Sequence, residues 1–111
     1  MNNPDSPTPK PSSPDLAKVS NTSFRSLPLG EIVATTNAIS QVANSAILIG
    51  LGRHACCDWG EVCPEDWELN DYAYANDQRV HSVYSTGSGL KFWIITEWDR
   101  SITTILMPED Y

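Results

Sequence analysis

Alternating apolar and polar positions are clearest in the last third of the chain, where they predict three strands. β-Branched and aromatic residues gather at 80–84, 91–97 and 102–107, with turn-forming residues between these segments. Short turns join antiparallel neighbours, so the three segments predict an antiparallel meander. Apolar side chains fall on both faces of 91–97, which indicates that this is the central strand.

A helix is predicted ahead of the meander at 37–49, where apolar residues recur every three or four positions. A side-chain oxygen of Thr36 or Asn37 would cap its first turn. Gly50 and Gly52 are expected to end the helix, because glycine readily takes the left-handed conformation found just past a helix C-terminus.

A second helix is predicted at 64–75. Pro64 suits the first turn of a helix, and Glu65 and Asp66 complement the positive end of the helix dipole. A β-branched run at 31–35 predicts a short strand near the start of the fold. The whole pattern predicts an α+β fold, in which a short N-terminal strand and two helices precede the meander and the strands complete a small sheet.

The first part of the chain is predicted to lie outside this fold. Residues 1–26 hold five of the eight prolines and many serines, and they lack the apolar density that would offset the entropy of ordering. We therefore expect a disordered Pro/Ser-rich tail at 1–26 and a single α+β domain at 27–111. No secretory leader pattern or membrane-length apolar run is visible, which predicts a cytoplasmic protein with no membrane association.

Negative charge is concentrated after the tail. Residues 1–29 carry two acids and three bases, whereas residues 30–111 carry twelve acids and four bases. Such a domain would repel the phosphate backbone, so no direct nucleic-acid binding is expected. A basic protein surface is the partner that this charge predicts.

Three cysteines, Cys56, Cys57 and Cys63, lie within eight residues, and their odd number fits a reducing compartment. Side chains of adjacent residues point apart, and His54 and His81 do not complete a zinc-binding spacing, so we expect no metal and no cofactor. The acids nearby would raise the pKa of a thiol, which disfavours a cysteine nucleophile.

The segment Arg53–Gly60 is the densest in chemically active side chains. His54 paired with Asp58 could act in general acid–base catalysis, with Arg100 binding a phosphate, which would make a small hydrolase or nuclease. In the alternative that we favour, His54 packs beside Trp59 and hydrogen-bonds to the loop backbone.

Arg100 and Ser101 lie on the predicted turn between the last two strands. The guanidinium and the backbone amides of such a turn could bind an anion. The structural alternative is that Arg100 pairs with the carboxylate of Glu97 or Asp99 and holds the turn.

An acidic run extends from Asp58 to Asp71 and contains six acids and no base. Three of them, Glu61, Glu65 and Glu68, have three- and four-residue spacing, which predicts a row of carboxylates along one helix face. Such a row can imitate nucleic-acid phosphates and occupy a basic groove. The alternative is an ordinary solvated face.

Short segments spread over the domain carry a family resemblance. They are Leu29–Thr35, Arg53 and His54, Asp58–Gly60, Trp93–Glu97, Asp99–Ser101, Thr103 and Thr104, and Leu106–Tyr111. These segments resemble a family of small plasmid-related proteins of bacterial plasmids and integrative elements, some labelled as associated with type I restriction systems. The resemblance implies no catalytic role. The chain departs from that family at Cys57, where the family has glycine.

Two functions follow from these patterns. The first is a noncatalytic accessory protein of a mobile genetic element that modulates a host defence or restriction system through an acidic surface. The alternative is the hydrolase or nuclease. The residues expected to bind a partner are Arg53, Trp59, Glu61, Glu65, Glu68, Arg100 and Ser101, and the catalytic candidates are His54 and Asp58.

Overall fold

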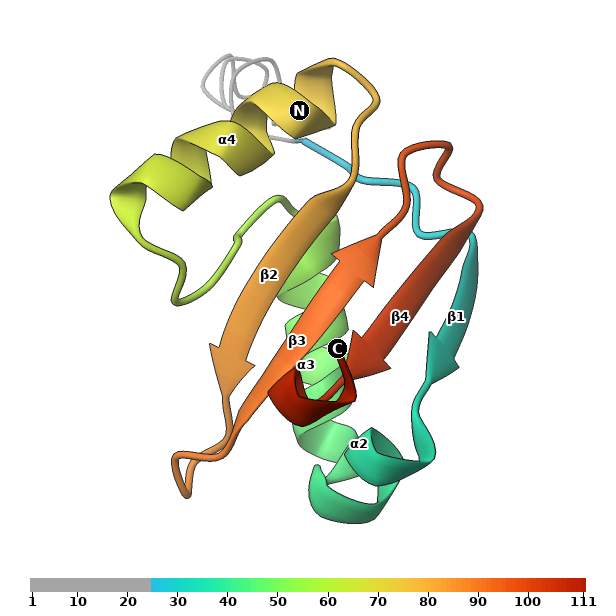
Figure 1. Cartoon of the computed structure of the whole chain (residues 1–111), viewed down its shortest axis with the longest axis vertical. Helices are drawn as coiled ribbons and strands as arrows, with labels where there is room; N and C mark the ends of the chain where they lie inside the picture. Colours follow the sequence, from blue (N-terminus) through green and yellow to red (C-terminus); the bar gives the residue numbers. More distant parts are fainter. Residues whose placement is uncertain (1–24) are drawn as a thin grey trace, which may run out of the picture.

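The structure of the protein is a computed structural model that describes residues 25–111 (Figure 1). Its elements in chain order are β1 (Glu31–Ala34), α2 (Thr36–Gln41), α3 (Asn44–Ala55), α4 (Pro64–Ala75), β2 (Val80–Ser85), β3 (Lys91–Thr96), β4 (Ile102–Leu106) and the 3-10 helix η1 (Pro108–Asp110). The predicted α+β class is confirmed. The predicted tail lies outside the described residues except for Arg25 and Ser26.

The strands form one mixed sheet in the order β1-β4-β3-β2. The predicted meander is confirmed, because β3 pairs antiparallel with both β2 and β4. Strand β1 pairs in parallel with β4, a feature that the sequence does not predict. Helices α3 and α4 lie between β1 and β2, and α4 ends beside the start of β2 (Figure 1). Strand β2 runs in the same direction as β1, and β4 does so again two turns later.

The helix predicted at 37–49 is two helices, because Val42 has an extended backbone and its side chain is buried in the core. The N-cap is Thr35 rather than Thr36 or Asn37, and its hydroxyl accepts from the amide of Ala38 at 3.0 Å. The connection at Val42 lets α3 start again in a new direction, over the sheet.

The prediction that Gly50 and Gly52 end the helix is wrong. Both residues lie inside α3. Gly50 is buried, and a Cβ atom there would lie 3.1 Å from the ring of Phe92. Gly50 therefore allows close approach of α3 to the sheet. The helix ends at Ala55, just before Cys57, whose φ is 63°.

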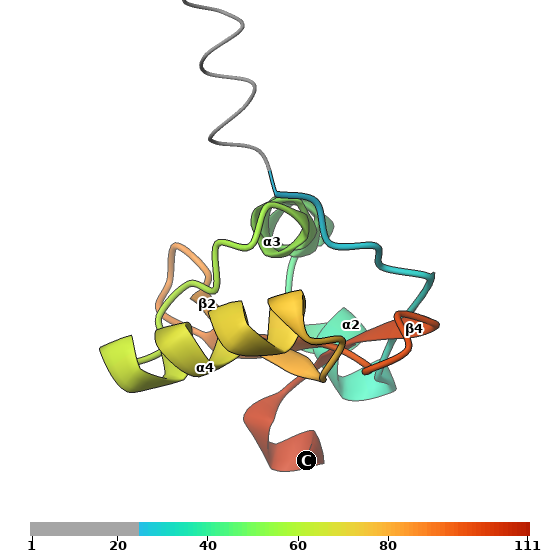
Figure 2. The same cartoon turned by 90° about the horizontal axis from the view of Figure 1, so that it is seen from above.

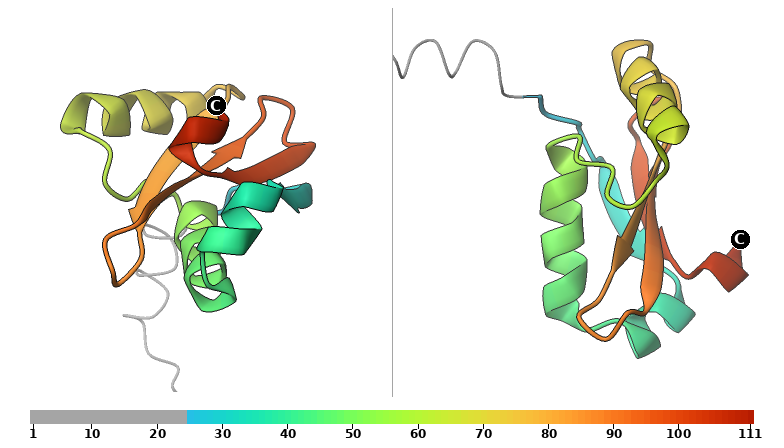
Figure 3. Two further views of the ribbon diagram at one scale, coloured as in Figure 1. Left: turned by 60° about the horizontal axis from the view of Figure 1, so that its bottom comes forward. Right: turned by 90° about the vertical axis from the view of Figure 1, so that its left-hand side faces the viewer.

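Helix α3 covers one face of the sheet, and η1 lies on the opposite side (Figures 2 and 3). The core beneath α3 contains Tyr84, Phe92, Ile94 and Ile105. Helix α4 has the predicted bounds and lies against β2, near the end of the sheet where β2 begins (Figure 1). No helix in the described part of the chain is long and apolar enough to cross a membrane.

Candidate functional site

His54 lies on α3 and is fully buried. Its Nδ1 is 2.6 Å from the hydroxyl of Ser82, and its Nε2 is 2.8 Å from the hydroxyl of Thr96. The ring also meets Trp59 edge to face at 5.7 Å, as the favoured alternative predicts. Its polar partners, however, are hydroxyls of the sheet instead of the loop backbone.

These bonds belong to a buried chain that crosses the sheet. The hydroxyl of Thr96 lies 2.7 Å from that of Thr103, which donates to the carbonyl of Leu29 at 2.7 Å. A carbonyl only accepts, so Thr96 donates to Thr103, Nε2 of His54 donates to Thr96, and Nδ1 accepts from Ser82. The imidazole is neutral, and burial lowers its pKa to about 4.

Asp58 contacts Arg53 instead of His54. The guanidinium donates to the two carboxylate oxygens at 2.8 and 3.2 Å, and the amide of Gly60 donates at 3.1 Å. The hydrogen bond from Arg53 holds the pKa of Asp58 below its ordinary value. The hydroxyl of Tyr84 donates to the Asp58 carbonyl at 2.6 Å, so this segment braces the loop against β2.

Arg100 connects two elements through backbone carbonyls. Its guanidinium donates to the carbonyls of Ala73 at 3.0 Å, Gln78 at 2.6 Å and Glu97 at 3.2 Å. A cation here also complements the negative end of the α4 dipole. The expected pairing with a carboxylate is not formed, because these carbonyls occupy the donors. Ser101 donates its hydroxyl to Asp99 at 2.6 Å.

The structure does not bring His54, Asp58 and Arg100 together through any hydrogen bond, since each is occupied by other partners. Trp59 is fully buried and donates its indole N–H to Asp71 at 2.9 Å, so it offers no binding surface. Within residues 25–111, no group of three or more His, Cys, Asp or Glu side chains could hold a metal ion.

The predicted row of carboxylates is wrong in one member, because Glu61 precedes α4 instead of lying on it. Its amide donates to the carbonyl of Val83 at 2.7 Å, which fixes it beside β2. Its carboxylate accepts from Lys91 at 2.5 Å and from Ser85 at 2.9 Å, and the Lys91 bond lowers the pKa of Glu61.

The acidic run divides into paired and unpaired members. The paired members are Asp58 with Arg53, Glu61 with Lys91, and Asp71 with Arg25. The unpaired ones are Glu65, Asp66 and Glu68, which have no basic group within 4 Å in the described part of the chain. All three are exposed and lie on the first turns of α4. Uncompensated negative charge is therefore gathered on one short surface, which we call the α4 acidic surface.

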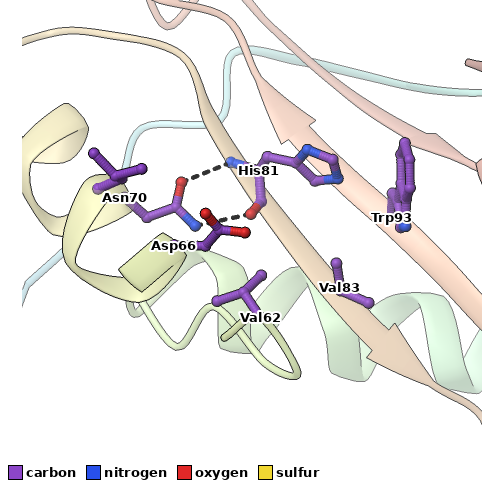
Figure 4. Close-up of a pocket in the computed structure, with 7 residues that line it drawn as sticks. Val62, Asp66, Asn70, His81, Val83 and Trp93 are labelled. Atoms are coloured by element: carbon purple, nitrogen blue, oxygen red, sulfur yellow. Dashed lines mark hydrogen bonds between the residues drawn. The ribbon is translucent and has the colours of Figure 1, made fainter. Parts of the chain in front are cut away.

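A hollow of about 380 Å³ adjoins this surface, between α4 and the face of the sheet opposite α3 (Figure 4). Its lining residues are Val62, Asp66, Leu69, Asn70, His81, Val83 and Trp93. The Asn70 carboxamide donates to the carbonyl of His81 at 2.8 Å and accepts from its amide at 3.1 Å. This pair links α4 to the outer edge of β2, which forms one side of the hollow.

His81 is the unusual member of the lining. Its Nε2 is the single buried side-chain nitrogen or oxygen in residues 25–111 that lacks a hydrogen-bond partner. The ring lies 4.4 Å from that of Trp93. Burial, followed by the nearby Arg79, lowers the pKa of His81, while Asp66 opposes the shift, so the imidazole is neutral at pH 7.

We compared the chain with family models, with curated proteins and with solved structures, and none of them matches it. Sequence reasoning identified Glu65 and Glu68 but missed Leu69, His81 and Trp93. The one available signal was Leu69, an apolar residue among exposed acids.

Proposed function

We propose that the protein is a noncatalytic binding protein whose α4 acidic surface docks onto a basic protein partner. The observation that carries this proposal is the division of the acidic run. Three of its acids are matched by bases within the fold, whereas Glu65, Asp66 and Glu68 are left together on one helix.

Unpaired acids on α4 contribute little to the fold itself. A negative charge in the first turn gains from the helix dipole, which favours Glu65 and Asp66, but Glu68 lies beyond that turn. Like charges three residues apart repel, as Glu65 and Glu68 do. A concentrated negative surface instead speeds and orients the approach of a positively charged partner.

The resemblance to plasmid-related proteins favours a partner in a host defence or restriction system. Enzymes that act on DNA present basic grooves to its phosphates. The proposal is that α4 occupies such a groove in place of nucleic acid, as a component of a mobile genetic element.

The hydrolase or nuclease alternative has no comparable support. A general base must reach the proton that it removes, and His54 is fully buried with both nitrogens bonded to hydroxyls. The groups that would help it are also occupied, Asp58 by Arg53 and Arg100 by backbone carbonyls.

The test measures binding of the full chain to an oligolysine peptide by isothermal titration calorimetry, and then capture of partners from a bacterial host. The double variant Glu65→Gln and Glu68→Gln removes two unpaired charges. We expect it to bind roughly tenfold more weakly, because about 1.4 kcal/mol is lost with two charge contacts. Added salt should weaken binding by the unmodified chain.

A matched control is the double variant Glu31→Gln and Glu109→Gln, which removes the same charge from exposed positions outside α4. This control should lose much less affinity. An equal loss in both double variants would show a general charge effect and would overturn the assignment to α4.

A further inference from the structure

We propose that the hollow between α4 and the sheet receives one long basic side chain, lysine or arginine, of the partner protein. This inference rests on the proposed function and assigns a specific pocket to it. The pocket is defined by Asp66 and Leu69 from α4 and by His81, Val83 and Trp93 from the sheet (Figure 4).

The walls of the hollow fit the stem of such a side chain. Val62, Leu69, Val83 and Trp93 make most of the lining apolar, and Leu69 is 65% exposed although it is a leucine. Lysine and arginine carry an aliphatic stem that packs on apolar surface while the charged end seeks polar partners. Burial of that stem would also cover Leu69.

The charged end has two partners in the hollow. Asp66 has no basic group within 4 Å in the described part of the chain, so its carboxylate is available for a charge-assisted hydrogen bond. The indole of Trp93 attracts a cation through the negative potential of its face. No positively charged residue lines the hollow; Arg79 lies outside the lining but close enough to lower the pKa of His81, so Asp66 and Trp93 must outweigh its repulsion of a cation.

His81 lines the hollow beside Trp93 and carries a buried nitrogen without a hydrogen-bond partner. A buried polar atom without a partner costs free energy, and Nε2 of His81 is such an atom. A neutral imidazole offers one acceptor nitrogen, whereas ammonium and guanidinium groups only donate.

A second, more open hollow of about 400 Å³ lies along the same helix and shares Val62 with the first. Pro64, Trp67 and Glu68 complete its lining, so it again combines apolar walls with an unpaired carboxylate. Two hollows of the same chemistry on one helix fit a partner that presents several basic side chains.

The test compares peptides and variants by calorimetry. The peptides are an arginine-containing peptide and the same sequence with citrulline, which keeps the shape of arginine and removes its charge. The variants of the full chain are Leu69→Ala and Asp66→Asn, both at exposed positions of α4. We expect citrulline to abolish binding, and each variant to weaken binding of the arginine peptide by about five- to tenfold.

Nuclear magnetic resonance gives the position of the peptide. The indole N–H signal of Trp93 and the imidazole signals of His81 should shift on titration with the arginine peptide, while those of buried Trp59 and His54 should not. Equal binding of the citrulline peptide, or shifts that avoid Trp93 and His81, would overturn the pocket.

The pocket and the proposed function fail in different ways. If Leu69→Ala binds normally while Glu65→Gln with Glu68→Gln binds weakly, the acidic surface docks the partner without a side chain in the hollow, and the inference is wrong. If neither change weakens binding, both proposals are wrong. Binding of free butylamine as tight as that of the peptide would mark a small-molecule site and overturn the protein partner.

Discussion

His54 shows how one residue can look catalytic in the sequence and be structural in the fold. Active sites often place a histidine beside a carboxylate or a thiol. In the structure, both ring nitrogens of His54 bond to hydroxyls beneath α3, and its side chain has no contact with solvent. The residue contributes to stability as a neutral group, and this makes the fold sensitive to pH.

Acid should destabilise the protein through His54. Its pKa is about 4 in the folded chain and near 6.5 when unfolded, so the unfolded state binds more protons between these values. The contribution is complete above pH 6.5 and is lost as the pH falls towards 4, on the order of 3 kcal/mol in total. Urea unfolding at several pH values from 7 to about 4.5 measures it.

The control for this prediction is His54→Gln, which cannot titrate in that range. The variant is expected to be less stable at pH 7 but to lose less free energy of unfolding on acidification. In this variant His81, whose pKa is also lowered, still makes the free energy of unfolding fall with decreasing pH, but less steeply. Identical slopes in the two proteins would contradict the role given to His54.

Cys57 is a second residue whose structural role is visible only in the backbone conformation. It directly follows the C-cap of α3 and has a φ of 63°, a conformation that glycine adopts at little cost. The cysteine is buried, and its side chain belongs to a second, smaller hydrophobic cluster with Leu27, Trp59, Ala73 and Val80.

At the scale of elements, the sequence predicts those whose signals are local. The bounds of α4 follow from Pro64 and the acids after it, and the three meander strands follow from β-branched runs and turns. The break at Val42 could not be predicted, because Val42 continues the apolar period and leaves the helix to fill the core. Gly50 resembles a helix end in the sequence, because its packing partner, Phe92, is distant along the chain.

The candidate site was predicted only in part for the same reason. Glu65 and Glu68 could be found, since carboxylate spacing is a local pattern. The ion pairs of the other acids could not be predicted, because Glu61 with Lys91 and Asp71 with Arg25 come together only in the folded chain. The hollow needs side chains from α4, β2 and β3 at once, so no single segment of the sequence describes it.

Arg100 connects the C-terminal end of α4 to the β3–β4 turn through hydrogen bonds, and its replacement should destabilise the fold. Arg100→Met removes three charge-assisted bonds to carbonyls, two of them partly buried and the one to Gln78 exposed. We expect a loss of about 2–3 kcal/mol in the free energy of unfolding, measured with urea. Arg79→Met is the matched control, since Arg79 pairs with Glu97 at the surface and should cost less than about 1 kcal/mol. Equal losses of unfolding free energy in the two variants would contradict the claim that the Arg100 hydrogen bonds contribute more than a surface ion pair.

At the scale of the whole molecule, the acidic residues of the described domain outnumber the basic residues that could pair with them. Residues 25–111 carry twelve acids and five bases, and the ion pairs among them are exposed and therefore weak. Repulsion between the remaining acids opposes the compact state. The protein thus keeps a surface charge that its own stability does not favour.

Salt should therefore stabilise the protein at pH 7. Raising sodium chloride from about 10 mM to about 150 mM shortens the screening length and weakens the repulsion, so the melting temperature should rise by a few degrees. Glu65→Gln with Glu68→Gln should melt higher than the unmodified chain at low salt and respond less to salt. A lower melting temperature for this double variant would show that the two acids stabilise the fold.

The buried series of hydrogen bonds from Ser82 to Leu29 has a fixed donor-to-acceptor direction. Its last member is a carbonyl, which cannot donate, so each hydroxyl before it must point the same way, and the imidazole can hold its proton only on Nε2. The tautomer of His54 is thus dictated by a peptide group that precedes it by 25 residues. Because that proton is sealed under α3, its exchange with solvent water reports each opening of the layer between α3 and the sheet.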